Sequence, residues 1–199
     1  MKCRFGVALT LLAVSLSVLP AADKPLRIFI SVSGQTQGPG QHDYPRFLAD
    51  WKPLLEGRGA SVDGALRFPT KAELAQTDVL LIYAPDANRS GRTGRALLES
   101  FVKRGGGLVA LHDAVCGTNA GWMKNLVGGA KAHGETNWSR GSVGLYFGGY
   151  QHPITKGVSN FDLDDQSIFN LEMMPGVKVI ASTFHPTRPG NVIRNIPNA

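Results

Sequence analysis

Three short apolar runs, each followed by a polar or glycine-rich break, constrain the fold of this chain more than any other feature. They are LRIFISVS at 26–33, DVLLIYA at 78–84 and LVAL at 108–111, and each is typical of a buried strand. Between them, residues 43–56 and 93–103 repeat apolar side chains at helical spacing. This alternation predicts an α/β fold, in which helices cover both faces of a parallel sheet through right-handed crossovers.

Weaker signals place the remaining elements. Residues 60–68 can form a patchy strand at a sheet edge, and Thr70 with Glu73 matches a helix-capping box. We expect a helix over 122–127, glycine-rich loops from there to 151, and a last strand over 177–182. In the helix at 43–56 we expect Phe47 and Trp51 to pack against the sheet.

The N-terminus has the pattern of a secretory signal peptide. Lys2 and Arg4 precede an uncharged apolar stretch at 5–18, and small residues lead to Ala22. The stretch is short of the about 20 residues that span a bilayer, although a retained membrane anchor is the alternative. We therefore expect a signal peptide at 1–22, one domain at 23–199, and a secreted or periplasmic protein without stable membrane insertion.

The charged residues and cysteines exclude some classes of partner and site. The net charge is +6, but no basic cluster or nucleic-acid module is present, so nucleic acid is not an expected partner. Cleavage would leave Cys116 as the single cysteine, which cannot form an internal disulfide. The oligomeric state cannot be deduced from these features.

Histidines follow the predicted strands. His42 comes after the first strand and its loop, His112 directly ends the run at 108–111, and His185 follows the last predicted strand. Ligands of open parallel sheets bind beyond the carboxyl ends of the strands, so His42 and His112 should face one pocket there. The alternative is chance, because loops hold many polar residues.

The segment GGGLVALHDA at 105–114 is the sharpest local feature. An apolar strand ends in a polar residue and turns at once into small residues, as in the elbow that raises a nucleophile above an α/β sheet. Here the raised residue would be His112, which could act as a base, a metal ligand or a hydrogen-bond donor. Asp113 could orient a ring, bind a metal, or only cap the following helix.

These segments together resemble the ThuA-like family, which is named for trehalose utilisation. The resemblance rests on GGGLVALHDA followed by Trp122 and VGGA at 127–130, on HDY at 42–44, and on HPITKG at 152–157. It implies a three-layer, flavodoxin-like parallel sheet related to class I glutamine amidotransferases. In those enzymes the elbow carries a cysteine; His112 stands here instead, so a Cys-dependent amidotransferase is not expected.

Two departures from the family pattern bear on the site. Where members often have Asp-Glu and an aromatic residue after the HPI segment, this chain has DDQ at 164–166, which weakens a role for the second acid. The family also usually continues into a further strand and a closing helix. This chain ends at Ala199, so we expect a C-terminally truncated, incomplete fold.

The resemblance implies a protein that acts on a sugar or keto-sugar, as a hydrolase or an isomerase, by acid–base or metal-assisted chemistry. Candidate catalytic residues are His42, His112 and Asp113, and candidate substrate-binding residues are Trp122, His133 and His152. Zinc is the metal to test, with His42 and His112 as ligands, although the chain has no tight ligand motif.

Two alternatives to an enzyme remain open. The first is a non-catalytic sugar-binding module, in which tryptophans such as Trp122 or Trp138 stack on sugar rings. The second is a flavin-binding protein that uses the loop at 33–40, which has glycines but no recognised phosphate motif. Turnover of keto-sugars and the colour of the purified protein would distinguish these hypotheses.

Overall fold

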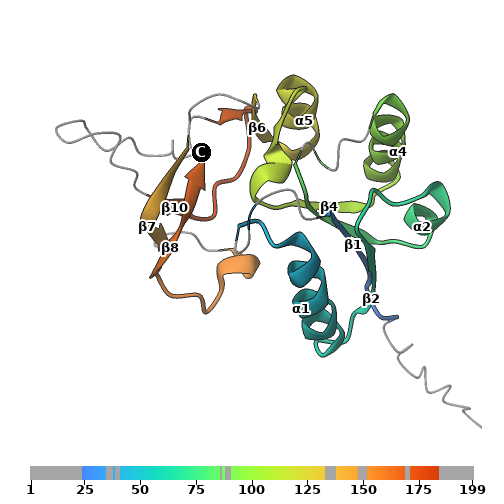
Figure 1. Cartoon of the computed structure of the whole chain (residues 1–199), viewed down its shortest axis with the longest axis horizontal. Coiled ribbons are helices and arrows are strands. Elements are labelled where there is room, and N and C mark those ends of the chain that lie inside the picture. Colours follow the sequence, from blue (N-terminus) through green and yellow to red (C-terminus); the bar gives the residue numbers. More distant parts are fainter. Residues whose placement is uncertain are drawn as a thin grey trace, which may run out of the picture.

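A four-stranded parallel sheet forms the centre of the molecule (Figure 1). The computed structural model describes residues 24–34, 38, 41–85, 87, 91–132, 138–147, 152–168 and 171–183. The strand order is β2-β1-β3-β4, which is the order of flavodoxin-like sheets. The strands are β1 (Arg27–Val32), β2 (Ser61–Ala65), β3 (Val79–Tyr83) and β4 (Gly107–Ala110). The α/β prediction is confirmed, and β2 lies at an edge as expected.

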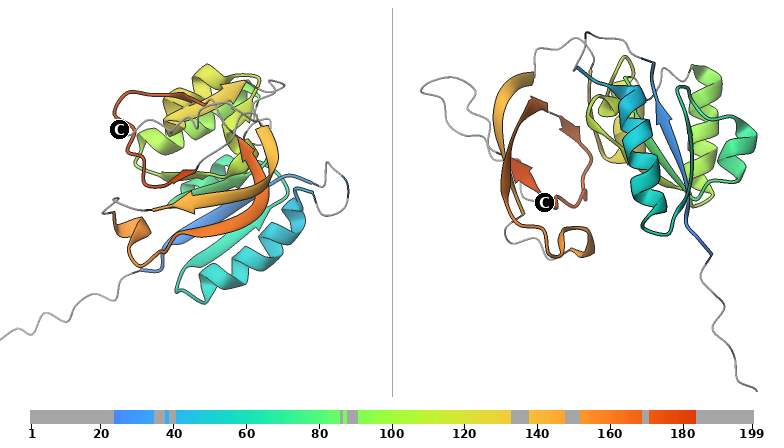
Figure 2. Two further views of the ribbon diagram at one scale, coloured as in Figure 1. Left: turned by 90° about the vertical axis from the view of Figure 1, so that its left-hand side faces the viewer. Right: turned by 60° about the horizontal axis from the view of Figure 1, so that its bottom comes forward.

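Helices cover both faces of this sheet and complete three layers (Figure 2). On one face lies α1 (Tyr44–Glu56), whose Tyr44 packs with Ile30 and Leu81. The opposite face carries α2 (Lys71–Ala75), α4 (Arg92–Lys103) and α5 (Ala120–Val127). The alternation of β-strand side chains produces the two cores, because Leu80 and Ile82 point to one face while Leu81 points to the other.

Local sequence signals fix where the helices begin and end. Asp43 precedes α1 and accepts a hydrogen bond from the backbone N–H of Arg46. The Thr70–Glu73 capping box forms as predicted at the start of α2. Gly128 ends α5 in the left-handed conformation, with φ of +88°, which glycine adopts without strain.

A second group of strands lies beside the carboxyl edge of the parallel sheet (Figure 1). Its main part is the antiparallel pair of β7 (Trp138–Tyr146) and β8 (Phe161–Ile168), to which β10 (Ser182–Thr183) adds on the β7 side. Beside it run β5 (Cys116–Gly117), β6 (Gly129–Ala132) and β9 (Glu172–Met173). Short 3-10 turns follow β4 and precede β8, as η1 (His112–Val115) and η2 (Pro153–Thr155).

Two predictions about secondary structure were wrong in this second group. The glycine-rich stretch expected as loops contains β6 and β7, because pairing with β8 and β5 supplies hydrogen bonds that no local pattern reveals. The expected strand over 177–182 shrinks to Ser182–Thr183, and it is antiparallel to β7.

One of the two packing predictions for the helix at 43–56 holds. Phe47 packs against the α1 side of the sheet as predicted, but Trp51 is 40% exposed and stacks on the Phe47 ring at 5.0 Å. Trp51 therefore lies at the rim of the core. Within the described residues, no helix combines the length and apolar character needed to cross a membrane.

Candidate functional site

Both histidines that the sequence selected occupy strained turns. His112 follows β4 directly with φ of +50°, and His42 precedes α1 with φ of +44°. Non-glycine residues rarely adopt positive φ, and such strain persists where the surrounding structure holds it, often at functional sites. The turn after β4 therefore has the raised geometry that the sequence predicted for His112.

The two imidazole rings meet at the carboxyl edge of the parallel sheet. Their Nε2 atoms are 3.0 Å apart, a hydrogen-bond distance, and the ring centroids are separated by 5.0 Å. The predicted proximity of His42 and His112 is confirmed, and their sharing of one pocket stays a prediction. Because each neutral ring has one donor and one acceptor nitrogen, one Nε2 donates and the other accepts.

Burial and neighbouring charge set the protonation of this pair. Burial lowers the pKa of His112 below its usual value, and the adjacent His42 ring lowers it further. The charges of Asp113 and Asp165 and a hydrogen bond with Gln166 oppose this shift only in part. Nδ1 of His42 is buried and has no hydrogen-bond partner among the described residues. The neutral form of His112 is therefore favoured.

A buried carboxylate lies directly beside the histidine pair. Asp113 is 8% exposed, and its Oδ2 accepts a hydrogen bond of 2.5 Å from the hydroxyl of the fully buried Tyr44. Its other oxygen has no hydrogen-bond partner in the described part of the chain. The N-cap position of η1 is Leu111, and Asp113 lies inside this turn, so the capping alternative is not supported. Tyr44 also stacks on His42 at 5.8 Å, which links the two turns a second time.

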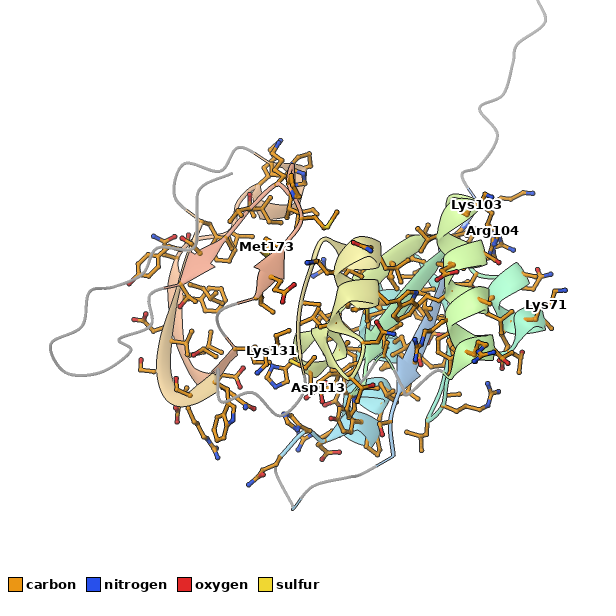
Figure 3. The ribbon with its side chains drawn as sticks, turned by 90° about the horizontal axis from the view of Figure 1, so that it is seen from above. Lys71, Lys103, Arg104, Asp113, Lys131 and Met173 are labelled. Atoms are coloured by element: carbon orange, nitrogen blue, oxygen red, sulfur yellow. The ribbon has the colours of Figure 1, made fainter. Side chains whose placement is uncertain are left out.

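A polar cavity opens between the turn before α1 and the β7–β8 pair. His42 lines it, and His112 adjoins it through its Nε2 contact with His42. The cavity has a volume of about 630 Å³. Its lining residues come from the turn before α1 and from the two strands: Gln41, His42, Trp138, Arg140, Asp164, Asp165 and Gln166. In Figure 3, Asp113 lies where the parallel-sheet part of the molecule faces the β7–β8 pair. The volume falls within the range of small-molecule sites.

Comparison with known proteins gives the family. The family model for ThuA, described as trehalose utilisation, matches residues 31–199. The chain belongs to the ThuA family. Among solved structures, a ThuA-like protein from Bacteroides uniformis is similar in fold, with a TM-score of 0.59 and 18% sequence identity. That match covers 92% of this chain but 66% of the other, so this chain spans just under two thirds of its length. No curated protein matches in sequence.

Other residues selected from the sequence lie away from the cavity of this ThuA-family chain. Trp122 packs between α4 and α5, where its indole N–H donates to Glu99 at 2.6 Å and Arg95 covers its ring. His152 precedes η2, and its Nδ1 accepts a hydrogen bond from the N–H of Ile154. Neither is among the residues that line the cavity, and their role in substrate binding stays a prediction. His133 and His185 lie outside the described residues.

The structure adds site residues that sequence reasoning missed or discounted. Asp165 lines the cavity and its charge acts on His112, although its departure from the family pattern had weakened its case. Gln166 faces Arg140 across the β7–β8 ladder and hydrogen-bonds with His112. The polar stretch at 161–168 was the available signal, but only its pairing with β7 brings it to the histidines.

The predicted zinc site is incomplete in the described part of the chain. No group of three or more histidine, cysteine, aspartate or glutamate side chains there is arranged to hold a metal ion. Zinc sites generally have at least three protein ligands, and His42 and His112 supply two. The metal site stays a prediction, and no chemical step below passes through a metal.

We expect acidification to destabilise the protein in two separate pH ranges. Because the pKa of His112 is lowered in the folded state, its contribution to stability is present above the unfolded value of 6.5 and is lost as the pH falls below it. The pKa values of Glu73 and Asp78 are lowered to about 2, so their contributions are lost only below the unfolded values of 4.5 and 3.8. The free energy of unfolding, measured by urea denaturation from pH 8 to pH 3, should fall in both pH ranges. His112→Asn should remove the upper one, and a variant that keeps it would contradict this assignment.

Cys116 is expected to be dispensable for activity. It is a buried thiol at the start of β5, and it is not among the residues that line the cavity. Cys116→Ser should leave turnover nearly unchanged in a steady-state assay. A loss of more than about 100-fold, the scale of a catalytic group, would show that the thiol takes part.

Proposed function

We propose that this ThuA-family protein acts on a sugar or keto-sugar in carbohydrate utilisation, with His42 and His112 as its acid–base pair. The observation that carries the proposal is the Nε2–Nε2 distance of 3.0 Å at the edge of a polar cavity. Acid–base catalysis needs positioned groups that titrate near neutral pH, and histidine is the side chain best suited to it.

The cavity has the composition that a carbohydrate requires. Trp138 is 55% exposed and offers an aromatic face for the C–H groups of a sugar ring. Around it, carboxylates, amides and a guanidinium provide the donors and acceptors that bind ring hydroxyls. This chemical complementarity supports Trp138, Asp164 and Asp165 as the substrate-binding residues of the proposal.

The histidine pair can remove and return one proton. A neutral His112, favoured by its lowered pKa, accepts a proton from a substrate hydroxyl or from a carbon next to a carbonyl. The hydrogen bond between the rings lets the proton be shared with His42, and the pair then returns it to the substrate or to the leaving oxygen. The same step serves an isomerase or, with water as the second reactant, a hydrolase.

The proposed substrate is a small carbohydrate met outside the cytoplasm. The signal-peptide pattern at 1–22 supports export, but those residues lie outside the described part of the chain. N-terminal sequencing of protein recovered from the periplasm or medium tests this part, since an intact Met1 would contradict cleavage near Ala22.

Purified protein incubated with trehalose and its mono-keto derivatives tests the activity. Turnover followed by chromatography, together with binding followed by tryptophan fluorescence, separates the two leading functions. Turnover supports the enzyme, while binding without turnover supports a non-catalytic sugar-binding module. A parallel arm with chelator and then added zinc tests the metal-assisted form. Failure of every sugar to bind would overturn the proposal.

A further inference from the structure

Tyr83 lies at the carboxyl end of the central strand β3, between the two strands that lead to the catalytic candidates. It is paired with Val32 at the end of β1, and β4 on the other side ends just before His112. In an open parallel sheet this edge is where ligands bind. Tyr83 thus comes from β3, which lies between β1, the strand that leads to His42, and β4, the strand that leads to His112.

The Tyr83 ring is held in place on three sides. It meets Tyr44 at 4.8 Å and Phe47 at 4.9 Å, both edge to face, and His112 at 6.4 Å. Edge-to-face packing at these distances fixes the orientation of an aromatic ring. The residue is half-buried, and its hydroxyl makes no hydrogen bond with any residue that the structure describes. A fixed phenol with an unused donor is suited to a ligand.

Charges from three elements reach this hydroxyl. Burial, and after it the charges of Asp113, Asp165 and Asp43 in that order, together raise the pKa of Tyr83 to about 12. These residues belong to η1, to the cavity-lining strand β8 and to the turn before α1. The Tyr83 ring contacts His112, and these carboxylates act on its hydroxyl from the elements that build the site. The hydroxyl stays protonated and able to donate throughout the range in which histidine titrates.

We propose that Tyr83 is a further catalytic residue, whose hydroxyl donates a hydrogen bond to the substrate oxygen that gains negative charge during proton transfer. The inference rests on the proposed function, because it assigns a role within the same acid–base reaction. The His42–His112 pair moves the proton, and Tyr83 stabilises the oxygen on which charge develops. The proposed substrates therefore carry a carbonyl or hydroxyl oxygen on the reacting carbon, and this oxygen accepts the hydrogen bond from Tyr83.

Tyr83→Phe, assayed with trehalose and its mono-keto derivatives, tests the role with minimal change of shape. We expect kcat to fall by about 100-fold, as for loss of one oxyanion donor. KM should change by less than roughly threefold, since the bond strengthens only in the transition state. Tyr146→Phe is the matched control, because Tyr146 is an exposed phenol on β7. Circular dichroism and thermal unfolding establish that both variants fold.

A second measurement reads the contact without turnover. With 3-fluorotyrosine at position 83, saturating sugar should move the fluorine resonance, whereas the same label at position 146 should not respond. A folded Tyr83→Phe variant with unchanged kcat overturns the inference, and so does a rise in KM alone, which would indicate ordinary binding. If the native protein neither binds nor converts any of these sugars, the proposed function itself falls, and this role falls with it.

Discussion

Replacing both histidines, as His42→Asn with His112→Asn, is expected to lower kcat/KM for the sugar substrate by about 100- to 10,000-fold. Asparagine is the best replacement because it tolerates the positive φ of both turns yet cannot act as an acid or base near neutral pH. Each single substitution should lower kcat/KM nearly as much as the double substitution does. The rings share one hydrogen bond and work as a unit, and the effects of such residues are not additive.

His152→Asn provides the matched control for this experiment. His152 is a third histidine, but its ring caps η2 and does not line the cavity. The substitution should leave turnover unchanged. If the double variant at positions 42 and 112 retains full activity while folded, the acid–base assignment is wrong, and a substrate site elsewhere on the molecule would have to be sought.

Among substitutions that remove a single oxygen atom, we expect Tyr44→Phe to destabilise the protein most. The substitution removes the hydroxyl that donates to Asp113 at 2.5 Å and leaves both oxygens of a buried carboxylate without a partner among the described residues. An unsatisfied buried acceptor costs about 1–3 kcal/mol, and more when it is charged. The free energy of unfolding should fall by at least that amount at pH 7, as measured by urea denaturation.

A double-mutant cycle shows whether the carboxylate is the cause. In an Asp113→Asn background the same Tyr44→Phe change should cost less, because the remaining amide needs less compensation than a charge. Tyr146→Phe, an exposed phenol, should be close to neutral. Equal losses from Tyr44→Phe in both backgrounds would show that the hydroxyl acts independently of Asp113.

The sequence indicated the parallel sheet and two of the site residues because their signals are local. The apolar runs at 26–33, 78–84 and 108–111 each contain a strand close to the expected bounds, and the capping box at Thr70 forms as predicted. His42 and His112 were identified from their place after strands, and the topology of a parallel sheet requires such positions to share an edge. The misjudged exposure of Trp51 shows the limit, since helical spacing defines a face but not how far the sheet extends beneath it.

The cavity wall and the partners of the histidines were decided by tertiary structure alone. Asp165 and Gln166 come from β8, more than 50 residues after His112, and β7 is polar and interrupted by glycine, so neither strand has a strong local pattern. Their pairing places them at the site. The bond between Tyr44 and Asp113 likewise joins residues 69 positions apart. Strand formation and helix capping depend on neighbours in the chain, so this sequence determined them. Side-chain partners depend on how separate layers pack, and that information exists only once the chain has folded.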